Sequence, residues 1–136
     1  MKRYVDACVY HNPMESAYTK CKGGMSMDLW KCDVCGYVCE AIQAPAVCIK
    51  CGVGSEHFQK LNEVQSQLLY DSERTNDQHI KIIALAAELI EAAKIGIEEN
   101  LDPGCKKVFE IVIKDAWEIK QLAKAELAGH QKKGKF

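Results

Sequence analysis

The 136-residue chain has neither a strong charge of one sign nor a long apolar run. Its 18 basic and 19 acidic residues leave a formal net charge of −1, which gives no indication of a nucleic-acid partner. No run of about 18 apolar residues is present, so no membrane span is expected. The N-terminus begins with charged residues and lacks the apolar stretch of a signal peptide. We therefore expect a cytoplasmic protein without membrane contact.

Sequence signatures of catalysis are also missing. We find no acid–base pair, no phosphate-binding loop and no nucleophile triad, so we expect that this chain alone is not an enzyme. A basic recognition helix is absent, which argues against DNA binding. No glutamate is followed three residues later by histidine, and that pattern is what a di-iron centre in a helical bundle requires.

Cysteine, in contrast, is abundant, and seven of the eight cysteines precede residue 52. A reducing cytosol keeps thiols free, so this number of cysteines indicates metal binding rather than disulfides. The motifs Cys32-Asp-Val-Cys35-Gly36 and Cys48-Ile-Lys-Cys51-Gly52 each turn two sulfurs toward one point. Two such turns that face each other form a closed tetrahedral site, which suits zinc and iron equally well.

The glycine that follows each motif has a physical role. Gly36 and Gly52 can adopt positive φ, which allows backbone N–H groups to point at the sulfurs. Such N–H···S bonds spread the thiolate charge and help to set a redox potential. The predicted metal ligands are Cys32, Cys35, Cys48 and Cys51.

The segment from Trp30 to Phe58 resembles the rubredoxin domain of rubrerythrins. It shares the aromatic residue two positions before the first cysteine, Gly36-Tyr37 after the second, Glu40, and the Ala44-Pro45 pair before the third. The resemblance implies one iron ion (Fe2+/Fe3+) per chain, bound by the four cysteines. It also implies that the protein passes single electrons between redox protein partners.

Two positions depart from the pattern of that family. Ile49 stands where the family usually has proline, and Cys39 stands where it often has histidine. Loss of the proline relaxes a rigid turn, so zinc stays open as the alternative metal. The competing function is then a zinc-ribbon structural or interaction protein, in which the metal folds the module and the helices bind a partner.

The remaining cysteines are expected to have structural roles. Cys8, Cys21 and Cys39, together with His11, show no ligand-like spacing, and small buried side chains that pack the metal module are the favoured interpretation. Cys39 is expected on a strand, near the metal but not bound to it. Cys105 opens the last helix, where the macrodipole lowers the pKa of a thiol, although an inert role is favoured for it.

Residues 4–10, 29–32 and 36–40 are expected to form short strands. Beyond them, no proline occurs from residue 61 to residue 100, and helical spacing of apolar residues takes over. The polar run at residues 71–77 is rich in capping residues and predicts a break or kink.

The last helix is predicted to begin at Asp102-Pro103, because these are favoured residue types for a helix cap and a first helical position. We expect it to end at Gly129, with a frayed basic tail from His130 onward. Trp117 is expected in the helical core, and His79, near a helix start, at the surface or next to a helix cap. Glu88 and Glu91 are expected on a solvated face, in ion pairs with Lys81 and Lys94 rather than as metal ligands.

The resulting prediction is an α+β fold with two domains, a rubredoxin-like or zinc-ribbon β module at residues 1–60 and a helical hairpin at residues 61–136. Ile82, Ile111 and Ile119 broaden the apolar stripes beyond what one neighbouring helix can cover. We therefore expect a homodimer in which two hairpins form a four-helix bundle. The alternative is that the metal region covers the open face.

Overall fold

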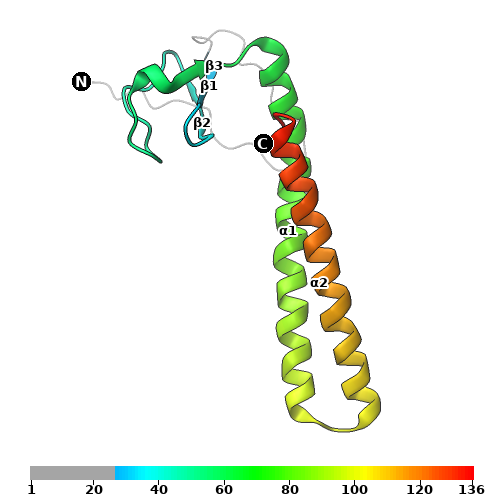
Figure 1. The fold of residues 1–136 in the computed structure, drawn as a ribbon. Coiled ribbons are helices and arrows are strands. Elements are labelled where there is room, and N and C mark those ends of the chain that lie inside the picture. Colours follow the sequence, from blue (N-terminus) through cyan, green and yellow to red (C-terminus); the bar gives the residue numbers. More distant parts are fainter. Residues whose placement is uncertain (1–26) are drawn as a thin grey trace, which may run out of the picture.

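The computed structural model describes residues 27–136 and shows an α+β architecture, with a small three-stranded sheet followed by two long helices (Figure 1). This architecture confirms the predicted fold class. The expected strand at 4–10 and the side chains Cys8, His11 and Cys21 lie outside the described residues.

The sheet is antiparallel, and β1 (Asp28–Cys32) lies between β2 (Val38–Ala41) and β3 (Phe58–Lys60). The two strands predicted for these residues are present, with shifts of one or two positions. A single 3-10 turn, η1 (Ser55–His57), leads into β3. The prediction missed β3 because three residues are too few to show the alternation typical of a strand.

Helix α1 (Glu63–Glu99) is continuous, so the predicted break at residues 71–77 is wrong. The polar side chains there do not cap a helix end. Ser72 donates its hydroxyl hydrogen to the Leu68 carbonyl one turn earlier, at 2.7 Å. The Asn76 side chain is buried and bonds to residues at the far end of the chain, so it stabilises a helix–helix contact instead.

Helix α2 (Pro103–Lys132) begins where predicted, and the Asp102 side chain accepts the Cys105 backbone N–H at 2.8 Å. Its predicted end at Gly129 is wrong, because the helix continues for three more residues. Gly134, with φ of 72°, follows the helix end instead. His130 is buried, at 7% exposure, so the prediction of a tail frayed from His130 onward is also wrong.

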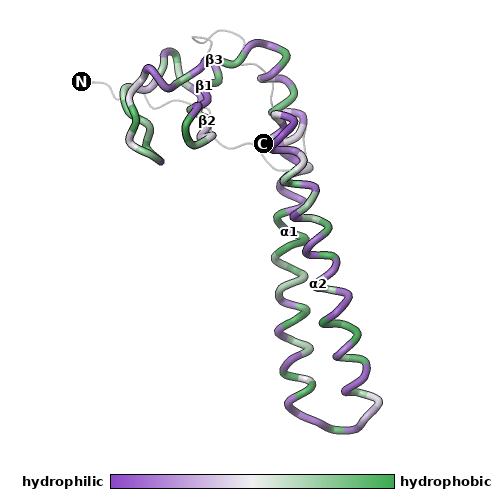
Figure 2. Tube along the Cα trace, viewed as in Figure 1, coloured by the Kyte–Doolittle hydropathy of each residue, from purple (hydrophilic) through white to green (hydrophobic). Residues whose placement is uncertain are grey.

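The two helices form an antiparallel hairpin, and hydrophobic and hydrophilic residues alternate along both of them (Figure 2). The apolar residues that are fully buried between the helices are alanines. The buried alanines come in pairs seven residues apart, Ala86 with Ala93 on α1 and Ala116 with Ala123 on α2. A seven-residue repeat keeps one side of each helix against its neighbour, and small side chains allow close approach. Neither helix has the length and apolar character to cross a membrane, as judged over the described part of the chain.

Much apolar surface remains uncovered along the hairpin. Ile82, Ile111 and Ile119 are 39%, 49% and 46% exposed, in agreement with the predicted broad stripes. Trp117 is 57% exposed, so its predicted place in the core is wrong. The described sheet lies beside the first turns of α1, at one end of the hairpin (Figure 1), so none of β1, β2 and β3 covers this surface.

Candidate metal centre

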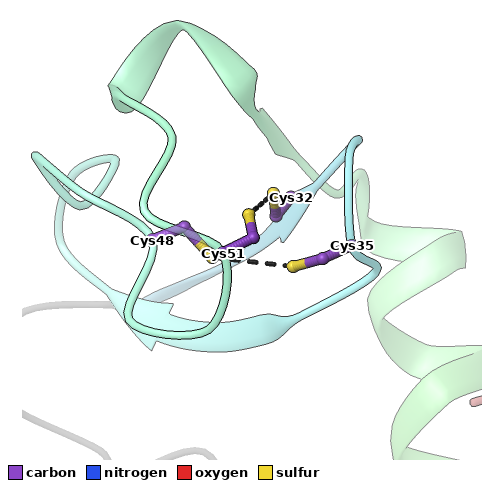
Figure 3. A group of neighbouring side chains, drawn as sticks. All are labelled: Cys32, Cys35, Cys48 and Cys51. Carbon is purple, nitrogen blue, oxygen red and sulfur yellow. Dashed lines mark hydrogen bonds between the residues drawn. The ribbon is translucent and has the colours of Figure 1, made fainter.

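The four predicted ligands meet at one point of the sheet module. Their Sγ atoms all lie within 4.8 Å of one another, and over residues 27–136 no other group of candidate ligands is so arranged. Figure 3 shows the sulfurs from two separate loops directed at each other. One loop follows β1 and the other lies between Val47 and Gly54, which form an isolated β-bridge. Residues 13 to 19 positions apart are thereby brought together.

Both loops use the same backbone hydrogen bonds. Gly36 N–H donates to the Cys32 carbonyl at 2.9 Å, and Gly52 N–H donates to the Cys48 carbonyl at 2.8 Å. The predicted positive φ is confirmed at both glycines, with values of 75° and 78°. The first cysteine of each motif also donates its own N–H to a carbonyl five residues later, on Tyr37 or Val53, at 2.8 Å. Each loop is therefore fixed by its own backbone.

The spacing of the sulfurs fits a metal ion. Four sulfurs about 2.3 Å from a central ion lie about 3.8 Å apart at the corners of a tetrahedron. The Sγ atoms of Cys32 and Cys51 are 3.8 Å apart, and those of Cys35 and Cys48 are 3.6 Å apart. Both short distances join one loop to the other, as a shared ion requires. The fold thus brings sulfurs of the two loops to the spacing that a tetrahedral ion requires at these two edges.

The electrostatics of the thiols also favour an ion. Burial alone would raise the pKa of Cys48, but backbone N–H groups of Cys51 and Lys50 point at its sulfur and lower the pKa to about 6. At Cys51 a bond from Val53 N–H acts in the same direction, yet burial and the three neighbouring sulfurs raise the pKa to about 12. Four adjacent thiols do not all ionise without a cation, because each thiolate repels the next.

The cysteines differ in their access to solvent. Cys32 and Cys48, the first residue of each motif, are 1% exposed and pack with Phe58. Cys35 is half-buried, and Cys51 is exposed. An ion held here would therefore have one side in the module and one side close to the surface.

Side-chain contacts around the site help to hold the two loops in place. Trp30 packs against the buried cysteines, and its indole N–H donates to the Ala41 carbonyl at 3.2 Å. Asp33 in the first loop accepts a hydrogen bond from His57 at 2.9 Å, taking the histidine in its Nδ1–H tautomer. Lys50 in the second loop donates to the Cys35 carbonyl at 3.2 Å. Sequence reasoning missed these partners, because their separations along the chain follow no motif.

Two cysteines of the described region lie apart from the cluster. Cys39 lies on β2, packs against the buried cysteines and is not among the four that converge, in agreement with the prediction. The lowered pKa expected for Cys105 is wrong. Its thiol donates a hydrogen bond to the Asp102 carboxylate at 3.2 Å, and that bond, with burial and the negative charge, raises the pKa.

The helical residues Glu88, Glu91 and His79 do not belong to the cysteine cluster. Glu88 and Glu91 are exposed, and Glu91 forms the predicted ion pair with Lys94 at 2.8 Å. His79 is not on the surface, since it is half-buried with its ring edge-on to that of His130, the centroids 6.0 Å apart. His79 belongs to the contact line between the helices. The prediction did not place it there, because it assumed a break at residues 71–77.

Comparison with known proteins bears on the metal module alone. Residues 30–59 match the family model described as the rubredoxin-like domain of rubrerythrin. This match confirms the resemblance inferred from the cysteine motifs and their flanking residues, and the helical region has no family match. No curated protein and no solved structure matches the chain.

Proposed function

We propose that this chain is an electron carrier in which one iron ion per chain is held by Cys32, Cys35, Cys48 and Cys51. The ion would accept one electron as Fe3+ becomes Fe2+ and pass it on in the reverse step. The observation that carries the proposal is that a rubredoxin-like segment brings four cysteine sulfurs within 4.8 Å of one another. The free thiols that the site needs fit a protein of the reducing cytosol.

The rigidity of the two loops supports transfer of single electrons. Both cysteine motifs are closed by their own backbone hydrogen bonds, and the two sulfur pairs that join the loops are already 3.8 and 3.6 Å apart, close to the spacing in a tetrahedral site. A change of charge at the ion therefore requires little movement of its ligands. The N–H groups of Lys50, Cys51 and Val53 that point at sulfurs spread the thiolate charge and would help to set the potential.

The exposed side of the site supports contact with redox protein partners. Each motif carries an apolar residue between its cysteines, Val34 in the first and Ile49 in the second, and these are 56% and 82% exposed. Apolar side chains beside the exposed Cys51 give a partner a dry contact close to the ion. The role proposed is that of a carrier between other proteins and not of an enzyme.

The competing function is a structural zinc site in an interaction protein, because four sulfurs at this spacing hold zinc equally well. Ile49 in place of the family's usual proline is the feature that favours it. In that case the exposed apolar surface of the hairpin would be the binding element. An electron carrier requires iron and gives a coloured protein, whereas a structural zinc site gives a colourless one.

The test is to purify the full chain anaerobically without added metal, measure bound metal, and record the visible spectrum before and after dithionite. One iron per chain, with a red colour that dithionite bleaches and air restores, is the expected result. Because heterologous expression can insert zinc, a zinc-loaded sample is unfolded, stripped and refolded with ferrous iron. Failure to bind iron, or iron that does not cycle, would overturn the proposal in favour of the zinc module.

A further inference from the structure

Burial defines which side of each helix faces the other. On α1 the buried and half-buried positions recur at intervals of four and three, and on α2 the same repeat occurs. The buried positions of the two helices, together with the half-buried positions that continue their repeat, are 72, 76, 79, 83, 86, 90, 93 and 97 on α1, and 109, 113, 116, 120, 123, 127 and 130 on α2. They are the a and d positions of a heptad repeat, with residues 76 and 113 at a.

A second apolar stripe runs along each helix outside this contact line. It occupies heptad positions c and g, and it consists of Ile82, Leu85, Leu89 and Ala92 on α1 and Val108, Val112, Ile119 and Leu122 on α2. In an antiparallel pair of helices the g positions of both lie on the same side of the contact line. The two stripes therefore form one continuous surface of the hairpin, here called the c/g face.

The opposite surface, at heptad positions b and e, is different in kind. Its exposed side chains are mostly charged: Asp77, Glu91, Lys94 and Glu98 on α1, and Lys107, Glu110, Lys114 and Lys124 on α2. Ile80 and Trp117 are the large apolar residues that interrupt it. Charged b and e positions are typical of a surface in water, whereas apolar c and g positions indicate a surface that is covered.

We propose that a second copy of this chain packs against the c/g face, so that two hairpins form a four-helix bundle. The c/g face can pack against its own copy, because both of its helices carry apolar side chains at the c and g positions, with Asp115 as the interruption on α2. Packing two such faces about a two-fold axis gives the commonest form of homodimer. Of the described strands, β1, β2 and β3 do not lie on this face, because their sheet is beside the first turns of α1, at one end of the hairpin (Figure 1).

The side of the hairpin that carries the c/g face is large enough for a stable dimer, and the apolar stripe of α2 spans about half of its length. The 30 residues of α2 span about 45 Å, and two helices side by side are about 20 Å wide, which gives about 900 Å². A specific interface of standard size buries about 800 Å² on each partner. The stripe of large side chains occupies the middle of this face, and Glu99 and Glu126 lie beyond its ends, as in an interface with an apolar centre and a polar rim. Asp115 interrupts the α2 stripe and must remain at its edge.

The test compares two substitutions on α1 that replace similarly exposed aliphatic side chains on different faces. Leu89, on the c/g face, is 50% exposed, and Ile80, on the opposite face, is 49% exposed. Sedimentation equilibrium on the metal-loaded full chain is expected to give a mass about twice 15.2 kDa for the wild type and for Ile80→Glu. Leu89→Glu is expected to raise the dimer dissociation constant at least about 100-fold, because the dimer would bury two unpaired carboxylates.

A second pair on α2 protects the test against misfolding. Ile119→Glu, on the c/g face, is expected to dissociate the dimer, and Trp117→Glu, on the opposite face, is not. Circular dichroism and metal content show which variants keep the fold, and only folded variants are used to compare dimer dissociation. A wild-type chain that stays at 15.2 kDa at tens of micromolar would overturn the proposal. So would dissociation by Ile80→Glu or Trp117→Glu that equals dissociation by Leu89→Glu or Ile119→Glu.

Discussion

The metal module and the helical hairpin are each stabilised in a different way. Within the described residues, the largest side chains that are almost fully buried are Cys32 and Cys48, and both are predicted ligands of the metal. The hairpin instead buries alanines along a regular repeat and needs no ligand for its contacts. A module of this size has too small an apolar core to fold firmly without a metal or a disulfide. The difference teaches that one short chain can combine stability from coordination with stability from packing.

The largest expected effect comes from removing the metal, which should disorder the module but leave the hairpin folded. Cys32→Ser takes away a buried ligand, so we expect less than about a tenth of an equivalent of bound metal and loss of order in the module. The hairpin should keep its helices, because its contacts do not include the module's core. Metal analysis and amide dispersion in NMR spectra measure the first effect, and circular dichroism at 222 nm measures the second.

The matched control is Cys39→Ser, which alters a half-buried cysteine of the same module that lies outside the cluster. This variant is expected to keep its metal. If Cys39→Ser lost metal to the same extent as Cys32→Ser, the assignment of the four ligands would be wrong. If Cys32→Ser also melted the hairpin, the two regions would not be independent in stability.

A smaller effect is expected from overfilling the contact line of the hairpin. Ala93 is 2% exposed, so Ala93→Leu forces a larger side chain between the helices and should lower the free energy of unfolding by about 1–3 kcal/mol. Ala84 is an exposed alanine of the same helix, and Ala84→Leu should change stability by less than about 0.5 kcal/mol. Urea unfolding followed by circular dichroism compares the two. Equal effects would show that the helices do not pack as described, and metal content should be unchanged in both.

The metal site was predictable from sequence because its information is local. Two cysteines and a glycine within five residues define each loop, and the observed φ at Gly36 and Gly52 follows from that short motif. The helices were predictable from their periodic apolar residues, and the start of α2 from Asp102 and Pro103.

The errors fall where a residue's partner is distant along the chain. Asn76 reads as a capping residue, yet its side chain meets the His130 ring, 54 residues away, at 2.6 Å. The same contact explains why α2 passes Gly129 and why the tail is not free at His130. Local propensity predicts a helix break at residues 71–77 and a helix end at Gly129, and the packing of the two helices overrides both.

The smallest expected effect concerns Cys105, where two local influences oppose each other at the start of α2. The helix macrodipole lowers the pKa of a thiol in this position, whereas the Asp102 carboxylate, as hydrogen-bond acceptor and as charge, raises it. Because the raised pKa keeps the thiol protonated, alkylation of Cys105 at pH 8 should be slower than that of a free cysteine. The rate should rise only at higher pH.

Asp102→Asn keeps an oxygen that accepts the Cys105 N–H but removes the charge, so the pKa should fall and alkylation at pH 8 should become faster. Peptide mapping by mass spectrometry, after timed reaction with iodoacetamide across a pH series, isolates this one thiol from the others. A rate that does not change in Asp102→Asn would mean that the macrodipole and not the carboxylate controls the thiol. The cap would then be purely structural, and the hairpin would differ from the metal module in a further respect, since only the module would use its local backbone and charges to tune a sulfur.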